Sequence, residues 1–589
     1  MNESTGHPPQ RGRSPISDDT SRDLLAAIGQ WTGGMSPQAF GGAWLNVLSR
    51  LALAPGRQLE LAQQAIRKSV ALAQFAGEAV RGGGDPVAPQ VTGTPYAQRF
   101  ADPAWAKFPF NVLAQTFVTG AELAREAVRH VPGANPDAEY VAGFTVREGL
   151  ELLAPDNYLP TNPRLIAQTR EERGRNLLRG VRNLAEDVQR AFKGQGPAGV
   201  ENYVVGEHTA ISPGKVILRN SLMELIQYSP ATAKVYAEPI LIVPAWIMKY
   251  YILDLSPKNS LVKYLTDMGH TVFMISWKNP TAEDRDVAMD DYLSLGVLAA
   301  LDAIEKVQPK RKVHAVGYCI GGTLLSIAAA ALGQRDDDRL ATMTLFAAQT
   351  DFSEPGELSV FVSPAQLAML EALMWKNGVL ESRQMGGAFQ LLRTYDLLWA
   401  PSVQSYLKGE RLGVNDLMSW NADGTRMAYR MHTDYLHQLY LNNDLAEGRY
   451  VALGETIDLA AIDAPMFVVG TETDHVAPWK SVYKVGKLVR SKDYSFCLTS
   501  GGHNAGIISG PQHPKRRHRV LTMKTGARLP SAEQYLEKVE PAQGSWWPTF
   551  AAWLAGHSSP TKVAPPKMGA AQKGLKPIVD APGEYVLAK

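Results

Sequence analysis

The sequence predicts an α/β domain that contains a helical insertion and follows a mainly helical N-terminal region. After residue 201, short β-branched runs alternate with helical segments, which is typical of a mostly parallel sheet covered by helices. This alternation stops over residues 351–445, where aromatic-rich helical sequence follows a predicted strand, as expected for a cap over a site. Residues 24–80 instead repeat apolar side chains at helical spacing.

These patterns divide the chain in order. Residues 1–20 are polar and are expected to form a disordered tail, and residues 21–200 a helical N-terminal domain with a Gly/Pro-rich linker at 81–95. Residues 201–555 are expected to form the catalytic domain, with the cap at 351–445, and residues 556–589 an irregular C-terminal tail. The predicted strands are 239–245, 270–277, 312–318, 340–348, 464–470 and 493–500.

Composition excludes several classes of protein. Lys and Arg number 60 and Asp and Glu 58 among 589 residues, a balance unlike the basic surface of a nucleic-acid binder. The chain has 2 cysteines, which supply neither a disulfide framework nor a Cys-x-x-Cys metal pair, so we expect no metal and a cytoplasmic setting. We also expect no secretory signal and no transmembrane segment, because no apolar run reaches the necessary length.

One cysteine lies in a distinctive turn. Gly317-Tyr318-Cys319-Ile320-Gly321 joins a predicted strand to a predicted helix, which is the Gly-x-nucleophile-x-Gly pattern of a nucleophile elbow. Such a turn places the thiol at a helix N-terminus, where thiolate is favoured and the Ile320 N–H can face an oxyanion. A buried structural cysteine is the alternative; a dinucleotide fingerprint fits less well, since it requires glycine at the cysteine's position.

The order of the other candidates supports an α/β-hydrolase fold, in which the acid and then the histidine follow the nucleophile. Asp474 follows the strand predicted at 464–470, and His503 follows the next one. The sequence therefore predicts a Cys319–His503–Asp474 triad. His475 is a rival base whose position beside the acid favours a structural role, while Cys497 and His314 are expected to be core residues.

The second oxyanion donor is expected after the strand at 239–245. Pro244 has no N–H, so Ile247 or Trp246 is the candidate, and Ile247 is preferred. A cysteine nucleophile would form a thioester, so acyl transfer from another thioester is nearly thermoneutral and the acyl group stays activated. That chemistry suits acyl transfer from an acyl-CoA-like donor better than simple hydrolysis.

From about Arg99 onward the chain resembles class I-type, single-subunit poly(3-hydroxyalkanoate) synthases. The matching segments lie in order along the sequence. They begin with an entry segment, RFADPAWAKFPFNVL, and the region of the strands predicted at 239–245 and 270–277, VPAWIMKYYILDLSPKNSLVKYLTDMGHTVFMISWKNP. The lipase-like box, cap, acid loop, histidine loop and Trp-rich signature follow as GYCIGG, DLLWAPSVQSYLKG with DLMSWNAD, GTETDHVAPW, SGGHNAGI and GSWWPTFAAWLAG. The family's catalytic cysteine, aspartate and histidine fall on Cys319, Asp474 and His503.

This resemblance implies an acyltransferase that polymerises (R)-3-hydroxyacyl-CoA into polyester with release of CoA, which is part of the substrate; no separate cofactor is expected. It also implies a homodimer in the cytoplasm at the surface of polyester granules. It further suggests that Trp246, Asp254 and Trp420 line the substrate pocket or support it, and that Ala505 lies near the acyl pocket. The chain departs from the family at Asn504, where an apolar residue is usual, and at Ala245, where proline is.

Two other functions stay open at this stage. A polyester depolymerase or acyl-CoA thioesterase could use the same triad, and a non-catalytic granule scaffold could retain the fold. Some surface features have two interpretations. The N-terminal helices could contact a granule or pack on the catalytic domain, and Trp546 and Trp547 are expected to be packing aromatics rather than contacts to a partner. The basic run at 515–519 is expected to be a solvated face rather than a CoA phosphate site.

Overall fold

The computed structural model describes residues 19–82, 85–524 and 528–589. The chain divides into two compact units. One consists of Met1–Gln30, Gly199–Gln384 and Asn415–Lys589, and the other of Trp31–Ala198 and Met385–Val414. The predicted tail at residues 1–20 lies outside the described residues except for its last two, which open helix α1 (Asp19–Trp31).

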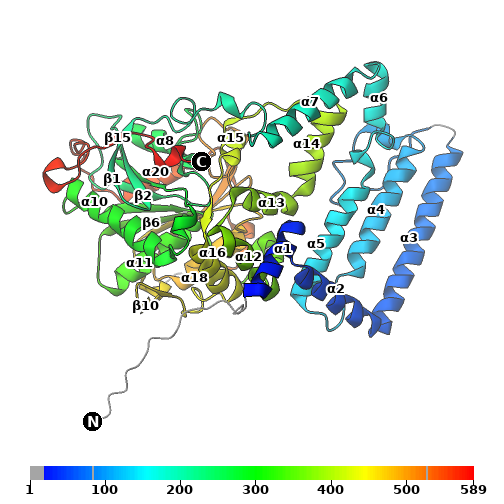
Figure 1. Cartoon of the computed structure of the whole chain (residues 1–589), viewed down its shortest axis with the longest axis horizontal. Helices are drawn as coiled ribbons and strands as arrows, with labels where there is room; N and C mark the ends of the chain where they lie inside the picture. Colours follow the sequence, from blue (N-terminus) through cyan, green and yellow to red (C-terminus); the bar gives the residue numbers. More distant parts are fainter. Residues whose placement is uncertain (1–18, 83–84, 525–527) are drawn as a thin grey trace, which may run out of the picture. The chain divides into compact units, whose positions relative to one another are not determined.

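In the described part of the first unit, eleven strands form one sheet in the order β14-β13-β12-β11-β6-β5-β3-β4-β2-β1-β15. Figure 1 labels β1, β2, β6 and β15 of this sheet. Its central strands run parallel and coincide with the six predicted from the sequence. This confirms the predicted α/β class. These strands are β3 (Ile240–Val243), β4 (Val272–Trp277), β5 (Val313–Tyr318), β6 (Leu340–Phe346), β11 (Met466–Thr471) and β12 (Asp493–Thr499).

Antiparallel strands that the sequence analysis did not identify extend both edges of the sheet. Several are half exposed and carry charged residues, so their sequences lack the apolar runs of the central strands. Strand β15 comes from the C-terminal segment, expected to be irregular, and pairs with β1. The edge strands are β1 (Gly214–Arg219), β2 (Met223–Tyr228), β13 (Arg517–Lys524), β14 (Ala542–Gln543) and β15 (Val579–Asp580).

Helices cover the parallel centre of the sheet, and this is why every residue of β3, β4, β5 and β11 is buried. Helix α11 (Ile320–Gln334) packs against β3, β5 and β6, and α17 (Trp479–Tyr483) packs against β11. The other α-helices within residues 199–350 and 446–589 are α8 (Leu261–Asp267), α9 (Met289–Asp291), α10 (Ala299–Val307), α18 (Val485–Leu488), α19 (Ala532–Lys538) and α20 (Trp547–Gly556).

Helices also fill the segment predicted as a cap. Within the first unit, α12 packs against α16, and the short strands β7 (Val379–Leu380) and β8 (Met427–Ala428) pair nearby. Helix α1 packs on α12, since Arg22 lies over the Trp375 ring at 4.2 Å. The helices of the segment are α12 (Pro364–Asn377), α13 (Ser382–Leu392), α14 (Ala400–Ser402), α15 (Asp416–Ala422) and α16 (Tyr429–Tyr435), with the helical turns η8 (Tyr395–Trp399), η9 (Val403–Leu407) and η10 (Leu436–Leu441).

The second unit is helical, as the sequence predicts for this region. Helix α2 packs against α5, and α3 against α4. Several helices start alike, with a side-chain N-cap followed by proline, a combination that satisfies and pre-shapes the first turn; the pairs are Ser36-Pro37, Asn135-Pro136 and Asn162-Pro163. The helices are α2 (Pro37–Ala52), α3 (Pro55–Arg81), α4 (Phe110–Ala127), α5 (Pro136–Leu153), α6 (Pro163–Glu171) and α7 (Arg175–Phe192).

Residues Met385–Val414, part of the predicted cap, pack with these helices. The contact is close because α7 carries a glycine at the crossing: a Cβ on Gly180 would overlap the backbone of Tyr406. The Asn176 side chain also donates to Leu407 O at 2.8 Å. The sequence predicts one cap over residues 351–445, but its residues 385–414 pack in the second unit and the rest belongs to the first unit.

Among residues 19–82, 85–524 and 528–589, no helix combines the length and apolar character needed to cross a membrane.

Candidate active site

Cys319 lies between β5 and α11 in a strained turn. Its φ of 53° falls in the left-handed region, which is rare for a residue with a side chain. The neighbouring glycines are required for space: a Cβ on Gly317 would lie 2.4 Å from Gly322 Cα, and one on Gly322 would lie 2.5 Å from Ala348 Cβ. The turn thus has the geometry of the predicted nucleophile elbow, with the thiol half-buried.

His503 and Asp474 lie in loops that follow β12 and β11. Because β5, β11 and β12 run parallel in one sheet, their carboxyl ends lie along the same edge. His503 Nδ1 lies 2.8 Å from Asp474 Oδ2. Backbone bonds fasten the two loops together, since the Thr473 N–H donates to Gly501 O at 3.1 Å. The acid and histidine chosen from the sequence therefore meet as a hydrogen-bonded pair.

The Asp474 carboxylate is fully buried and accepts further hydrogen bonds. Thr471 Oγ1 donates to Oδ2 at 2.9 Å, while the N–H groups of Val476 and Ala477 donate to Oδ1 at 2.9 and 2.8 Å. Burial alone would raise the pKa of Asp474, but His503 and these donors outweigh it and lower the pKa. Asp474 is therefore held as an anion that orients the imidazole.

His503 is poised to be protonated. Burial would lower the pKa of its ring, but the Asp474 carboxylate and the nearby Cys319 hold that pKa well above its usual value. A thiol and an imidazole in this contact can exchange a proton to give thiolate and imidazolium. His503 is thus hydrogen-bonded to Asp474 and close enough to Cys319 for the charge on that sulfur to raise the pKa of its ring.

The loop after β3 lies against the elbow. A Cβ on Gly321 would lie 2.4 Å from Val243 O and 2.5 Å from Pro244 O, so the first turn of α11 touches the end of β3 directly. Trp277 Nε1 donates to Pro244 O at 2.8 Å and fixes the start of this loop. The predicted oxyanion donor Ile247 is partly buried in this loop, and Ile320 occupies the first position of α11, where the helix leaves N–H groups unpaired.

Trp246 is enclosed by other aromatics. Its ring stacks on Tyr292 at 4.4 Å, and its indole N–H points to Met431 Sδ at 3.3 Å. Its carbonyl accepts from Thr425 Oγ1 at 2.6 Å. With 1% of its surface exposed, the Trp246 side chain ties the loop after β3 to the cap.

Trp420 and Asp254 are also buried supports. Trp420 Nε1 donates to Lys249 O at 2.8 Å, at the end of the loop after β3. Asp254 accepts from the hydroxyls of Ser212 and Ser260 at 2.5 and 2.6 Å. Burial raises the pKa of Asp254 from 3.8 to about 6. The sequence left two roles open for Trp420 and Asp254, lining the substrate pocket or supporting it. These buried contacts favour the supporting role.

Ala505 and Asn504 directly follow His503. Ala505 is partly buried, and its carbonyl accepts from Ser509 Oγ at 2.8 Å. Asn504 Oδ1 accepts a 2.5 Å hydrogen bond from the hydroxyl of Tyr318, the residue before Cys319. The unusual polar residue at 504 thus joins the histidine loop to the elbow.

The cap contributes aromatic residues that the sequence analysis did not select. Burial raises the pKa of Tyr435 and of Tyr440, and their nearness to Cys319 adds to both shifts. The two rings lie 5.4 Å apart, and Phe352 packs on Tyr440 at 4.8 Å. Tyr435 and Tyr440 are therefore near enough to Cys319 for its charge to affect them, and the aromatic-rich sequence of 351–445 did not identify these two residues.

The residues predicted to be core are buried as expected. Cys497 in β12 is fully buried, and burial raises the pKa of its thiol. His314 in β5 is also fully buried, with its ring nitrogens 2.8 Å from Thr342 Oγ1 and 3.0 Å from Ser558 Oγ. The ring bonded to Asp474 is that of His503, whereas the neighbouring His475 accepts at its backbone carbonyl from the Glu357 N–H.

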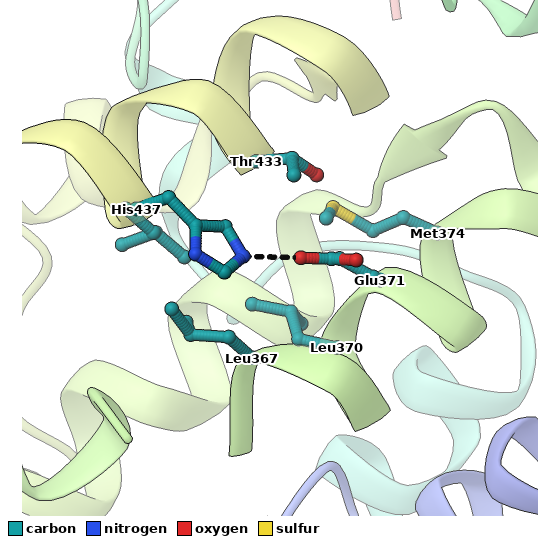
Figure 2. A pocket seen from close by; sticks show the side chains of 7 residues that line it. Leu367, Leu370, Glu371, Met374, Thr433 and His437 are labelled. Atoms are coloured by element: carbon teal, nitrogen blue, oxygen red, sulfur yellow. Dashed lines mark hydrogen bonds and ion pairs between the residues drawn. The ribbon is translucent and has the colours of Figure 1, made fainter. Parts of the chain in front are cut away.

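Figure 2 shows a small hollow in the cap, separate in its residues from the triad, between α12, α16 and η10. His437 Nε2 lies 2.5 Å from Glu371 Oε1 there, and this bond raises the pKa of His437. Apolar side chains of Leu367, Leu370 and Met374 surround the pair. Within the described ranges, no group of three or more His, Cys, Asp or Glu residues is placed to bind a metal ion.

Comparison with known families agrees with this architecture. The family described as "Poly-beta-hydroxybutyrate polymerase (PhaC) N-terminus" matches residues 96–265. The family described as "alpha/beta hydrolase fold" matches residues 238–507, the range that contains the elbow, the acid and the histidine. The predicted α/β-hydrolase fold is thereby confirmed.

Curated relatives are similar over most of the chain. The poly(3-hydroxyalkanoate) polymerase subunit PhaC of Rhizobium etli is 38% identical over 86% of this chain and 79% of its own length. The corresponding protein of Cupriavidus necator is 34% identical over 92% of this chain and 91% of its own. The poly(3-hydroxyalkanoate) polymerase of Methylorubrum extorquens is 37% identical over 85% and 82%. The chain therefore belongs to the poly(3-hydroxyalkanoate) polymerases, a family of acyltransferases.

Proposed function

We propose that this protein polymerises (R)-3-hydroxyacyl-CoA into poly(3-hydroxyalkanoate) through a thioester on Cys319. The observation that carries the proposal is the strained Cys319 elbow at the same carboxyl edge of the sheet as the hydrogen-bonded pair His503–Asp474, in a chain of this family. In the same proposal CoA is both part of the substrate and a product, and the chain uses no separate cofactor.

Acylation begins when His503 takes the proton of the Cys319 thiol. The sulfur attacks the thioester carbonyl of the substrate, and the oxyanion lies near the N–H groups of Ile320 and Ile247. The C–S bond to CoA then breaks, CoA leaves as a thiol with the proton returned by His503, and the acyl group remains on Cys319. One thioester replaces another, so this step is close to thermoneutral.

Chain growth follows when His503 takes the proton of a 3-hydroxyl group. The hydroxyl oxygen attacks the acyl carbonyl on Cys319, a C–O ester bond forms, and the C–S bond breaks. The proton passes from His503 to the departing sulfur, which regenerates the thiol. Throughout, Asp474 keeps Nδ1 of the ring protonated and stabilises its cation.

The family also suggests the setting of this reaction. We propose that the enzyme works as a homodimer in the cytoplasm, bound to the surface of the polyester granule that it produces. Sedimentation with purified granules and sedimentation velocity of the free protein test these two parts separately from catalysis.

The experiment that tests the proposed reaction supplies (R)-3-hydroxybutyryl-CoA to the purified chain. We expect release of CoA together with polyester of high mass on gel-permeation chromatography, and loss of both with Cys319→Ala. Release of CoA with free 3-hydroxybutyrate alone would instead identify a thioesterase or depolymerase. Full CoA release by Cys319→Ala would contradict the assigned nucleophile, and the absence of any CoA release by the unmodified chain would favour a scaffold.

A further inference from the structure

The loop that carries His503 has little regular structure of its own. Between β12 and β13, residues 503–508 form consecutive turns and residues 500–509 belong to no helix or strand, so the regular bonds of a helix or sheet do not pair their carbonyl groups. Buried carbonyl groups need hydrogen-bond donors from elsewhere. The groups that donate hydrogen bonds to this loop therefore fix the position of its backbone and of the His503 imidazole.

Two adjacent tryptophans supply donors from outside the loop. Trp546 Nε1 donates to Gly506 O at 3.0 Å, and Trp547 Nε1 donates to Ile507 O at 2.9 Å. Both side chains are almost completely buried, with 0% and 1% of their surface exposed. The sequence predicts packing aromatics at these positions, and they do pack, but their N–H groups also hold two successive carbonyls of the histidine loop.

The residues beside the tryptophans reinforce this arrangement. The Ser545 hydroxyl donates to Ser509 O, and Arg516 Nη2 donates to Ala505 O at 3.0 Å. Arg516 belongs to the basic run expected to be a solvated face; that expectation is wrong for Arg516, whose guanidinium is bound to the loop. The loop is thus held along one side by side chains that lie outside it.

The elbow also holds the loop. The Tyr318 hydroxyl donates to Asn504 Oδ1 at 2.5 Å, and the Tyr318 and His503 rings lie 5.6 Å apart. Gly506 meanwhile packs against Thr471, the residue whose hydroxyl donates to Asp474: a Cβ at Gly506 would lie 2.6 Å from Thr471 Cγ2. A shift of Gly506 would therefore move the backbone next to both the acid and the histidine.

We propose that Trp546 and Trp547 are positioning residues for His503, acting through their indole N–H groups on the carbonyls of Gly506 and Ile507. The inference rests on the proposed role of His503 as the base that activates Cys319. Glycine-rich turns are easily displaced, and a misplacement of about 1 Å at a reacting group can cost up to 10²-fold in rate. The tryptophan pair restricts that displacement while never touching the substrate.

The first test replaces each indole by a phenyl ring. Trp546→Phe and Trp547→Phe remove the N–H and keep an aromatic side chain. Trp553→Phe on the same helix is the matched control, because the buried Trp553 Nε1 has no hydrogen-bond partner among the residues that the structure describes. We expect kcat to fall about 10-fold in each of the first two variants with KM changed less than 2-fold, and the control to keep its kcat.

The second readout is independent of polymerisation. Iodoacetamide alkylates the thiolate that His503 stabilises, so we expect alkylation of Cys319 at pH 7 to slow about 10-fold in Trp546→Phe and Trp547→Phe, and to be unchanged in Trp553→Phe. Equal alkylation rates in all three variants and the unmodified chain would overturn the proposal. If the unmodified chain makes no polymer but its alkylation still depends on the two tryptophans, the positioning role stands and the proposed reaction fails.

A third variant separates the effect of the Trp546 N–H hydrogen bond from the effect of the size of the Trp546 ring. Replacing Trp546 by β-(3-benzothienyl)alanine exchanges the N–H for sulfur with nearly the same volume, so folding is preserved where Trp546→Phe would leave a cavity. We expect the same loss of kcat and of Cys319 alkylation as in Trp546→Phe. Unmodified rates in this variant would show that the ring's bulk, not its donor, matters, and would overturn the proposal.

Discussion

The edge of the sheet and the interior of the same unit contain the same three kinds of side chain in opposite situations. Each residue of the candidate triad has a counterpart of the same residue type buried elsewhere in the unit, among different neighbours. The pairs are Cys319 and Cys497, His503 and His314, and Asp474 and Asp254. The difference within each pair shows which features of the surroundings turn an ordinary residue into a candidate for catalysis.

The cysteines differ in backbone and exposure. Cys319 has a φ of 53° in a turn at the start of a helix and is half-buried beside His503. Cys497 lies in the middle of β12, fully buried, where burial raises the pKa of its thiol. A strand interior therefore keeps a cysteine neutral and inert, whereas the elbow exposes it to a base.

The histidines and aspartates differ in the sign of their pKa shifts. Burial lowers the pKa of His314 to about 4, whereas the Asp474 carboxylate raises the pKa of His503, which is also buried. Burial raises the pKa of Asp254, whereas His503 and the hydrogen bonds donated by Ala477 and Thr471 lower that of Asp474. Burial alone produces neutral side chains, and charged partners reverse the effect.

Replacing the cysteines should give the largest contrast. Cys319→Ala removes the only group proposed to carry the acyl chain, so we expect CoA release to fall by roughly 10⁵-fold or more. Cys497→Ala should keep the rate within about 2-fold and lower the free energy of unfolding by about 1 kcal/mol, because a small buried group is lost. The release of CoA from (R)-3-hydroxybutyryl-CoA measures the first effect and urea unfolding the second. Complete loss of activity in Cys497→Ala would break the comparison.

The histidines should differ nearly as much. His503→Gln removes the proposed base, and we expect kcat to drop by about 10⁴-fold or more. His314→Gln should leave kcat within about 3-fold and lower the melting temperature, since its two hydroxyl partners lose an optimal bond. Steady-state kinetics and thermal unfolding of both variants check this. A His314→Gln enzyme that folds normally but is inactive would mean that His314 takes part in the chemistry.

Replacing the two aspartates should distinguish a residue that orients His503 from one that only supports the fold. Asp474→Asn can no longer bind a protonated imidazole, so we expect kcat to fall by about 10³- to 10⁴-fold, and alkylation of Cys319 to slow as well. Asp254→Asn should keep most of its kcat, because its carboxylate bonds to serine hydroxyls rather than to the triad. Alkylation rates and kcat measured side by side would show the difference, and equal losses in the two variants would refute it.

The pH dependence of stability should distinguish the same two aspartates by sign. The pKa of Asp254 is raised from 3.8 to about 6, so the folded state binds the proton more tightly than the unfolded state. Its contribution is therefore fully present below about pH 3.8 and lost as pH rises to about 6, a change of roughly 3 kcal/mol. For Asp474, whose pKa is lowered, the contribution is present above pH 3.8 and lost on acidification.

Urea unfolding from pH 4 to pH 7 measures the contribution of Asp254. Asp254→Asn should flatten the loss of stability between about pH 4 and 6, and Asp474→Asn should leave that loss unchanged. An unchanged pH profile in Asp254→Asn would mean that Asp254 is not the group that titrates there.

The sequence could predict that the three candidate residues lie near one another because the sheet topology positions them. Parallel neighbouring strands bring their carboxyl ends to one edge, so the order Cys319, Asp474, His503 after β5, β11 and β12 implies proximity. The central strands were predictable for a similar reason, since strands buried on both faces are continuous apolar runs. Edge strands such as β13 carry charged residues and lack that signal.

Contacts between distant irregular segments were not predictable. Trp546 and Gly506 are 40 residues apart, and nothing in their local patterns indicates that an indole N–H meets that carbonyl. Likewise, Gly180 in α7 could not be matched with Tyr406 from sequence texture, so the division of the predicted cap at Met385–Val414 emerged only from packing. Loop paths and side-chain partners depend on the whole fold rather than on periodicity.

The central claim is that Cys319, and not Cys497, carries the growing acyl group. The most direct test is to mix the enzyme with (R)-3-hydroxybutyryl-CoA, quench with acid within milliseconds to seconds, digest at low pH and locate the added mass by mass spectrometry. We predict 3-hydroxybutyryl units on the peptide that contains Cys319, removable by hydroxylamine as expected for a thioester. An acyl group on Cys497 or on a hydroxyl side chain, with the Cys319 peptide unmodified during active CoA release, would contradict the account.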